Sequence, residues 1–248
     1  MVARTSHTYN RYRILQYLDE LSNGIDISAS VYVPSGLSAK EIDDLLKFVP
    51  DPNEVKSNII PEIEQLDHGG VLFYSDYEQY LIIPPFPMHD RVVFHGFMIE
   101  PLNKFLQQEF TIAVVLVRLG AYAVGVFKGE ALLSSKVGTG HIHSRHRKGG
   151  SSQRRFERGR EKQMEYFFDR VCARTREHVE PFLNGLDFVV YGGERQTLLN
   201  FRKDCKFLQN IDHRVLKRTL DVRYPKHNAL VHAIEDVWSS TVITWHRE

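Results

Sequence analysis

Three apolar segments that follow one another closely constrain the fold of this chain more than any other feature. Thr111–Leu119, Tyr122–Lys128 and Ala131–Val137 are rich in β-branched residues, and very short breaks containing Gly120 and Gly129 separate them. Turns this short join antiparallel neighbours, so the three segments predict a β-meander. The second half of the chain must be built onto that sheet.

The segments after the meander alternate between helix and strand. Their patterns predict a helix from Arg154 to Val179 that ends before Pro181, a strand Phe188–Tyr191, a helix Glu194–Leu208, a strand Val215–Val222 and a last helix Asn228–Trp245. The order is β-β-β-α-β-α-β-α. It predicts an α/β (α+β) mixed sheet with helices on its faces, as in ribonuclease-H-like folds.

The first part of the chain, residues 1–108, is predicted to be a smaller mixed α/β region with a supporting role. Helices are expected at Tyr9–Leu21, Ser38–Phe48, Glu54–Leu66 and Met98–Gln108, and strands at Ile25–Val33, Val71–Tyr74 and Tyr80–Ile83. Ser38 and Glu41 have the spacing of a capping box. We expect residues 109–248 to form a second domain.

Charge is distributed very unevenly along the chain. The net charge is only +1, but residues 136–176 contain 12 Lys and Arg against 4 Asp and Glu, which leaves 20 against 27 elsewhere. A basic block inside a near-neutral chain indicates an anionic partner, and nucleic-acid phosphates are the commonest one.

Compartment is indicated by cysteine usage and by the absence of targeting signals. Cys172 and Cys205 fit no metal motif, and we expect both to be buried free thiols in a reducing compartment. The N-terminus lacks a signal-peptide pattern, and Arg118 interrupts the longest apolar run, Thr111–Phe127. These features predict a cytoplasmic protein without a membrane span.

The loop 138–153 is the first candidate site. It is polar, basic and rich in glycine, and a solvated flexible loop is the simplest interpretation. Loops of this length inside a domain are usually functional or disordered, and the basic character continues into the next helix. We therefore expect an RNA-binding surface made by His143, Arg145, His146, Arg147, Lys148, Arg154, Arg155 and Arg158.

A metal site in this loop is the second interpretation. His141, His143 and His146 have chelating spacing, but no carboxylate or cysteine is near and the surrounding cations repel a dication. The glycine-rich stretches also lack the ending of a P-loop, and we expect neither a metal nor a cofactor.

The third interpretation is a catalytic tip. Gly149 and Gly150 allow the backbone to approach a ligand closely, and Ser151, Ser152 and Gln153 follow. A neutral glutamine is a poor general base, but it can orient a nucleophile and stabilise a developing oxyanion.

The segment Gly149-Gly-Ser-Ser-Gln153-Arg-Arg155-Phe156-Glu-Arg158, after three strands and at the start of a long helix, resembles a known family. It is similar to the Vms-like branch of the archaeal and eukaryotic class I peptide-chain release factors. The resemblance runs from Thr111 to the C-terminus and includes Phe188–Gly193 and Leu220–Tyr224. In termination factors the glutamine follows Gly-Gly directly, whereas here Ser151 and Ser152 intervene.

The resemblance implies an enzyme that cleaves peptidyl-tRNA on stalled ribosomes, as in ribosome-associated quality control. Gln153, Gly149, Gly150 and Ser152 would form its catalytic tip. Its partners would be the large ribosomal subunit, ribosomal RNA and peptidyl-tRNA. Residues 109–248 would be its catalytic domain, and residues 1–108 would support that domain or contact the ribosome. We expect a monomer. The Vms-like spacing favours cleavage of the tRNA near its 3′ CCA end by an endonuclease.

Two alternatives stay open. The protein could hydrolyse the peptidyl-tRNA ester in the manner of release factors, or bind the ribosome or RNA without chemistry. A metal-dependent nuclease of ribonuclease-H type is rejected, because residues 111–137 contain a single carboxylate, Glu130.

Overall fold

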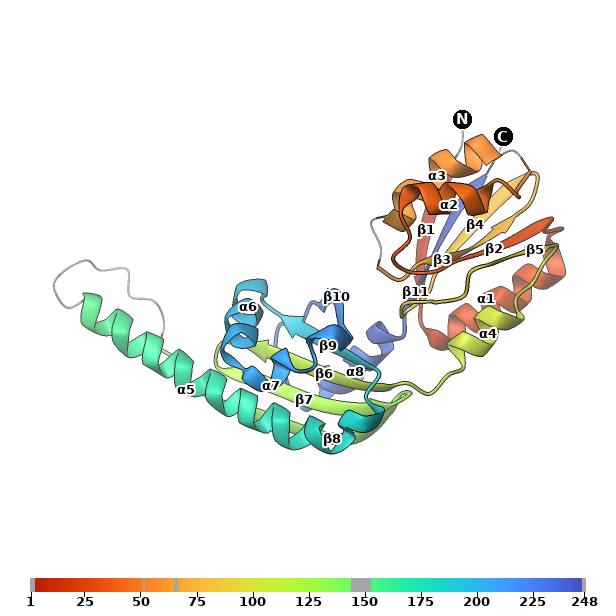
Figure 1. Cartoon of the computed structure of the whole chain (residues 1–248). Coiled ribbons are helices and arrows are strands. Elements are labelled where there is room, and N and C mark those ends of the chain that lie inside the picture. The colour runs from red at the N-terminus through yellow and green to blue at the C-terminus, as the bar shows by residue number, and fades with distance from the viewer. Residues whose placement is uncertain (1–2, 51, 65–66, 144–152, 247–248) are drawn as a thin grey trace. The chain divides into compact units, whose positions relative to one another are not determined.

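The computed structural model describes residues 3–50, 52–64, 67–143 and 153–246. The chain divides into two compact units (Figure 1). The first unit contains residues 1–108 and 237–248, and the second contains residues 109–236. Thus the chain leaves the first unit once, forms the whole second unit and returns.

The first unit is built on a six-stranded antiparallel sheet. Its strands are β1 (Ala3–Tyr9), β2 (Ala29–Val33), β3 (Gly70–Tyr74), β4 (Glu78–Ile83), β5 (Val92–His95) and β11 (Ser240–His246), in the order β1-β11-β4-β3-β2-β5. Its helices are α1 (Arg11–Gly24), α2 (Ala39–Leu46), α3 (Pro52–Glu64) and α4 (Glu100–Leu106). Helices α2 and α3 pack on one face of the sheet and α1 and α4 on the other, which gives two separate apolar cores.

The C-terminal strand corrects the prediction for the end of the chain. A helix over Asn228–Trp245 is wrong, because α8 spans only His227–Val237 and is followed by strand β11. Strand β11 lies between β1 and β4, where Ile243 pairs with Ser6 and with Leu81. The last residues therefore complete the first unit, and the second unit ends at residue 236.

The second unit confirms the predicted mixed sheet. The meander consists of β6 (Thr111–Arg118), β7 (Ala121–Lys128) and β8 (Ala131–Thr139), which pair antiparallel. Strands β9 (Phe188–Gly193) and β10 (Val215–Leu220) add in parallel on the other side, giving the order β10-β9-β6-β7-β8. Parallel addition requires crossovers, which the helices between these strands provide.

Helices cover both faces of this sheet. Helix α5 (Gln153–Val179) packs on β7 and β8 through Phe167, Phe168 and Val171, in a core shared with α6 (Arg195–Asp204). On the opposite face Leu230 of α8 lies against Gly125, where a β-carbon would be only 2.8 Å from the leucine side chain. The short helices η1 (Glu180–Gly185), α7 (Lys206–Gln209) and η2 (Asp212–Arg214) complete the connections.

Helix α5 is longer than the sheet on which it packs. Its first turns run past the ends of the strands in Figure 1, and the side chains of residues 155–159 are all exposed. We call residues 153–163 the arm of α5. None of the described helices combines the length and apolar character needed to cross a bilayer.

Candidate nucleic-acid interface

The candidate interface lies at the junction between β8 and α5. Strand β8 ends at Thr139 and the arm begins at Gln153. Most residues of the expected tip lie outside the described residues, namely Arg145, His146, Arg147, Lys148, Gly149, Gly150 and Ser152. The structure describes the backbone of Gln153 and Arg154 as the first residues of α5, without their side chains.

Residues 139–143, which we call the stalk, lie along α5. Arg170 donates a hydrogen bond to the carbonyl of Thr139 over 3.1 Å, and Gly140 lies against the ring of Phe167. At the other end, the amide of His143 donates to the side chain of Gln163 over 3.0 Å. The stalk therefore runs antiparallel to the helix, toward its N-terminus.

The helical residues that hold the stalk share one face of α5. Arg160, Gln163, Phe167 and Arg170 follow one another at intervals of three or four residues. This is the spacing of side chains that lie above one another on a helix. Arg160 completes the row by donating from Nε to the carbonyl oxygen of His143 over 3.1 Å. From the sequence, Arg160 and Arg170 were only two cations of the basic block 136–176, and Gln163 was not expected at this site.

Two histidines of the stalk lie side by side. The rings of His141 and His143 meet edge to face with their centroids 4.8 Å apart, and both side chains are exposed. His146, the third member of the predicted chelating set, lies outside the described residues. In the part of the chain that the structure describes, no three His, Cys, Asp or Glu side chains gather as metal ligands would.

The arm carries cations without acidic partners among the described residues. Arg155 and Arg158 are exposed, and no ion pair joins either of them to a described residue. Near the other end of the helix the arginines are paired, with Arg174 2.5 Å from Glu177 and Arg176 2.9 Å from Glu180. The positive end of the helix dipole adds to the charge of the arm. The arm is thus the part of α5 best suited to a polyanion.

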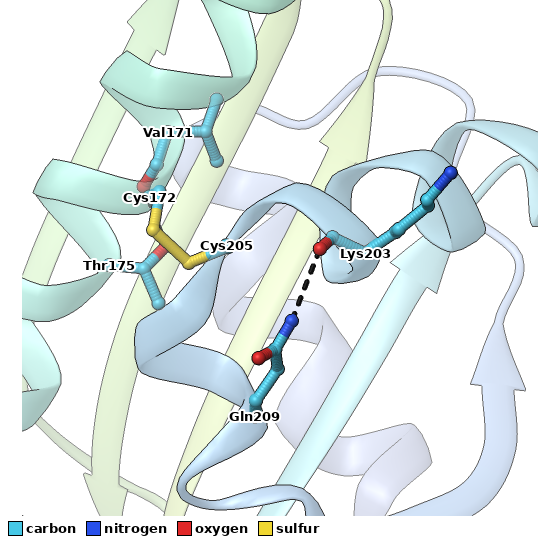
Figure 2. Close-up of a disulfide and its surroundings, with 6 residues drawn as sticks. All are labelled: Val171, Cys172, Thr175, Lys203, Cys205 and Gln209. Carbon is cyan, nitrogen blue, oxygen red and sulfur yellow. Dashed lines mark hydrogen bonds between the residues drawn. A yellow bond between two sulfur atoms is a disulfide. The ribbon is translucent and has the colours of Figure 1, made fainter.

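A disulfide fastens the C-terminal half of α5 to the rest of the unit (Figure 2). Cys172 is bonded to Cys205, which lies between α6 and α7, with their Cα atoms 5.5 Å apart. The predicted free thiols are therefore wrong. The pairing is possible because the predicted helix Glu194–Leu208 is broken at Cys205, whose backbone is extended. Gln209 donates to the carbonyl of Lys203 over 3.1 Å and braces this break.

The second glycine pair, Gly192-Gly193, serves the fold. Gly193 has a φ of +129°, and a β-carbon there would lie 2.1 Å from the carbonyl oxygen of Val117. Only glycine fits this position. Glu194 then precedes α6 and accepts a hydrogen bond from Thr197 over 2.7 Å. The pair is thus the junction between strand β9 and helix α6.

Fold and junction together define an α/β domain of release-factor type, in which a glycine-rich basic segment leads into a long helix at a glutamine. The family model of the Actinobacteria/chloroflexi VLRF1 release factor matches residues 110–243, more than half of the chain. The protein belongs to this family.

Relatives among characterised proteins agree with that membership. The chain is 28% identical over 139 residues to peptide chain release factor subunit 1 of Methanopyrus kandleri. The aligned span covers 55% of this chain and 34% of the relative. The chain thus matches about a third of that relative's length.

Two solved structures are similar at low identity. A crystal structure of the archaeal translation termination factor aRF1 shares 16% identity over 93% of this chain and 73% of its own, with a TM-score of 0.41. The Vms1 mitochondrial localization core shares 13% identity over 69% of this chain and 74% of its own, with a TM-score of 0.43.

Proposed function

We propose that the protein frees nascent chains from peptidyl-tRNA on stalled ribosomes, and that it does so by cutting the tRNA near its 3′ CCA end. The observation that carries the proposal is the family membership of residues 110–243, the span that contains the arm and the Gly-Gly-x-Ser-Gln segment. The proposal places the protein in the cytoplasm, on the large ribosomal subunit, as a monomer without a cofactor.

Charge on the arm supports an RNA partner. Arg155 and Arg158 are exposed on the part of α5 that extends past the ends of the strands, so they are accessible to a phosphate backbone. Contacts of this kind position a protein on RNA without reading its sequence. They would guide the tip along tRNA and ribosomal RNA.

In the proposed chemistry a ribose 2′-hydroxyl attacks the adjacent phosphorus. The bond from phosphorus to the 5′ oxygen breaks, leaving a cyclic phosphate on one fragment and a 5′-hydroxyl on the other. Gln153 would orient the attacking hydroxyl, and Arg145, Arg147 and Lys148 would stabilise the charge of the transition state. His143 or His146 would transfer protons, because one ring nitrogen of a neutral imidazole donates a hydrogen bond while the other accepts one.

Ester hydrolysis is the second candidate, because curated relatives of this chain are peptide chain release factors. In that reaction Gln153 would align a water molecule against the peptidyl ester, and the tRNA would keep its CCA end. Both reactions release the nascent chain from the ribosome. Hydrolysis gives a free peptide and an intact tRNA, whereas tRNA cleavage leaves the peptide esterified to a short 3′-terminal fragment.

Stalled ribosomal complexes with peptidyl-tRNA labelled on both the peptide and the tRNA 3′ end test the proposal. Wild-type protein should release the peptide and shorten the tRNA, and Gln153→Ala should bind the ribosome normally and lose turnover. Peptide release with an intact CCA end would establish ester hydrolysis instead. Ribosome binding without release by wild type would leave only a binding module, and that role predicts an unimpaired Gln153→Ala.

A further inference from the structure

We propose that Gln163 and Arg160 are positioning residues for His143. They hold the backbone of His143 against α5, the helix that begins with Gln153. The inference rests on the proposed function, in which Gln153 acts on the substrate. It assigns a role to two side chains that look like ordinary members of a solvated helix face.

The two side chains take both backbone groups of a single residue. Gln163 accepts from the amide of His143 over 3.0 Å, and Arg160 donates to its carbonyl oxygen over 3.1 Å. The two helical residues are three positions apart and therefore lie above one another on α5. His143 is thus held in the way that a neighbouring strand would hold it.

Side chains are required here because a helix offers no backbone partners. The amides and carbonyls of α5 are used within the helix, apart from those of its ends. An extended segment beside it can be bonded only by side chains long enough to reach. Glutamine and arginine have that length, and Arg170 uses it again at Thr139 over 3.1 Å.

The arrangement fixes the position of His143 along the helix relative to Gln153. Gln163 and Gln153 belong to one continuous helix and are ten positions apart, which corresponds to a rise of about 15 Å. Holding His143 at Gln163 therefore sets its separation from Gln153. In the proposed chemistry both residues act on one substrate, so a fixed separation favours the reactive geometry.

The position of the arm makes this contact more important. Residues 155–159 are exposed, so no packing against the sheet holds this part of the junction. Phe167, by contrast, is buried with Gly140 against its ring, which fixes the base of the stalk. Beyond this packed base, Gln163 and Arg160 are the described residues that hold the stalk to the arm.

Two substitutions at position 163 separate positioning from structure. Gln163→Leu keeps a similar volume and removes the acceptor, whereas Gln163→Glu keeps an acceptor oxygen at the same distance from the backbone. Gln196→Leu on α6 is the matched control, because Gln196 is exposed and bonds only to Asn200 among the described residues. Thermal unfolding of each variant checks that the fold is retained.

The first readout is the hydrogen-exchange rate of the His143 amide, measured by NMR on the full chain. We expect Gln163→Leu to speed this exchange about tenfold and Gln163→Glu and Gln196→Leu to leave it near the wild-type rate. Unchanged exchange in Gln163→Leu would overturn the inference, whatever the activity.

The second readout is single-turnover cleavage at saturating ribosomal complex, measured together with ribosome affinity. We expect Gln163→Leu to lower the rate about tenfold with Kd within about twofold of wild type, and Gln163→Glu to restore the rate. If wild type turns over and Gln163→Leu has the same rate, the inference is overturned and the proposed function stands. Absence of turnover by wild type would instead overturn the proposed function and the catalytic part of this inference, while the exchange result would still report on the contact.

Discussion

Gly140 lies so close to Phe167 that a β-carbon on residue 140 would be 2.6 Å from Cδ2 of the ring. Phe167 is only 2% exposed and is surrounded by the core of the second unit, so it has no room to withdraw. We expect Gly140→Ala to destabilise the protein by about 1–3 kcal/mol through overpacking, as measured by urea unfolding.

Gly159 provides the control for that substitution. A β-carbon there meets nothing within 4 Å, and the residue lies inside the exposed arm. Gly159→Ala should therefore stabilise the helical conformation of the arm by up to about 1 kcal/mol, and it should not lower the free energy of unfolding. Equal destabilisation by both substitutions would contradict the packing argument.

Reversing charge on the arm should weaken ribosome binding. We expect Arg155→Glu and Arg158→Glu each to reduce the affinity for the ribosome. Each lost phosphate contact should also make the negative slope of log affinity against log salt shallower by about one. Arg176→Glu makes the same change near the other end of α5, where Glu180 pairs with the arginine, and should have little effect. Equal losses in all three variants would indicate a nonspecific charge effect.

The disulfide between Cys172 and Cys205 should stabilise the second unit. It links positions 33 residues apart, and closing a loop of that length stabilises a fold by about 2–4 kcal/mol. We expect Cys172→Ala/Cys205→Ala, or reduction of the wild type, to lower the free energy of unfolding by that amount. Peptide mapping without reductant should recover the linked pair, and two titratable thiols in the native protein would contradict the bond.

The capping box of α2 should respond to acid. The amide and hydroxyl of Ser38 donate to Glu41 over 3.0 and 2.7 Å, and these bonds lower the pKa of the Glu41 carboxyl. A folded-state pKa below the unfolded one means that the contribution is complete above the ordinary glutamate pKa of about 4.3. It is lost as pH falls through the lower, folded-state value.

NMR titration of Glu41 and of the α2 amides should show this loss directly. Glu41→Gln retains an acceptor for Ser38 but has no carboxyl group to protonate. The chemical shifts of the α2 amides in this variant should therefore no longer change with the pH at which Glu41 titrates in wild type. A Glu41 carboxyl that titrates at or above its ordinary pKa would contradict the bonding.

The meander and the α5 helix could be predicted from the sequence because their signals are local. β-branched runs with short turns define β6–β8, and Pro181 marks the end of α5. Strand β1 was missed because nearly all its side chains are exposed, so it has no alternating pattern. In β11 the β-branched run Thr241–Thr244 was a usable signal, but its partner β4 is distant in sequence.

Only part of the candidate site could be predicted from the sequence. The glycines and cations of the tip stand out as residue types, whereas Gln163 and Arg160 resemble any polar helix residues until the stalk is seen beside them. The bond between Cys172 and Cys205 likewise depends on where the break after α6 meets α5. Such contacts between distant segments have no local signature.

The return of the chain to the first unit has a consequence for synthesis. Strand β11 is translated after the whole second unit, yet it fills the gap between β1 and β4. Until it emerges, both neighbours keep open edges, and the core lacks Ile243 and Trp245. The growing chain can finish its second unit first, but the first unit cannot close until the ribosome has translated β11.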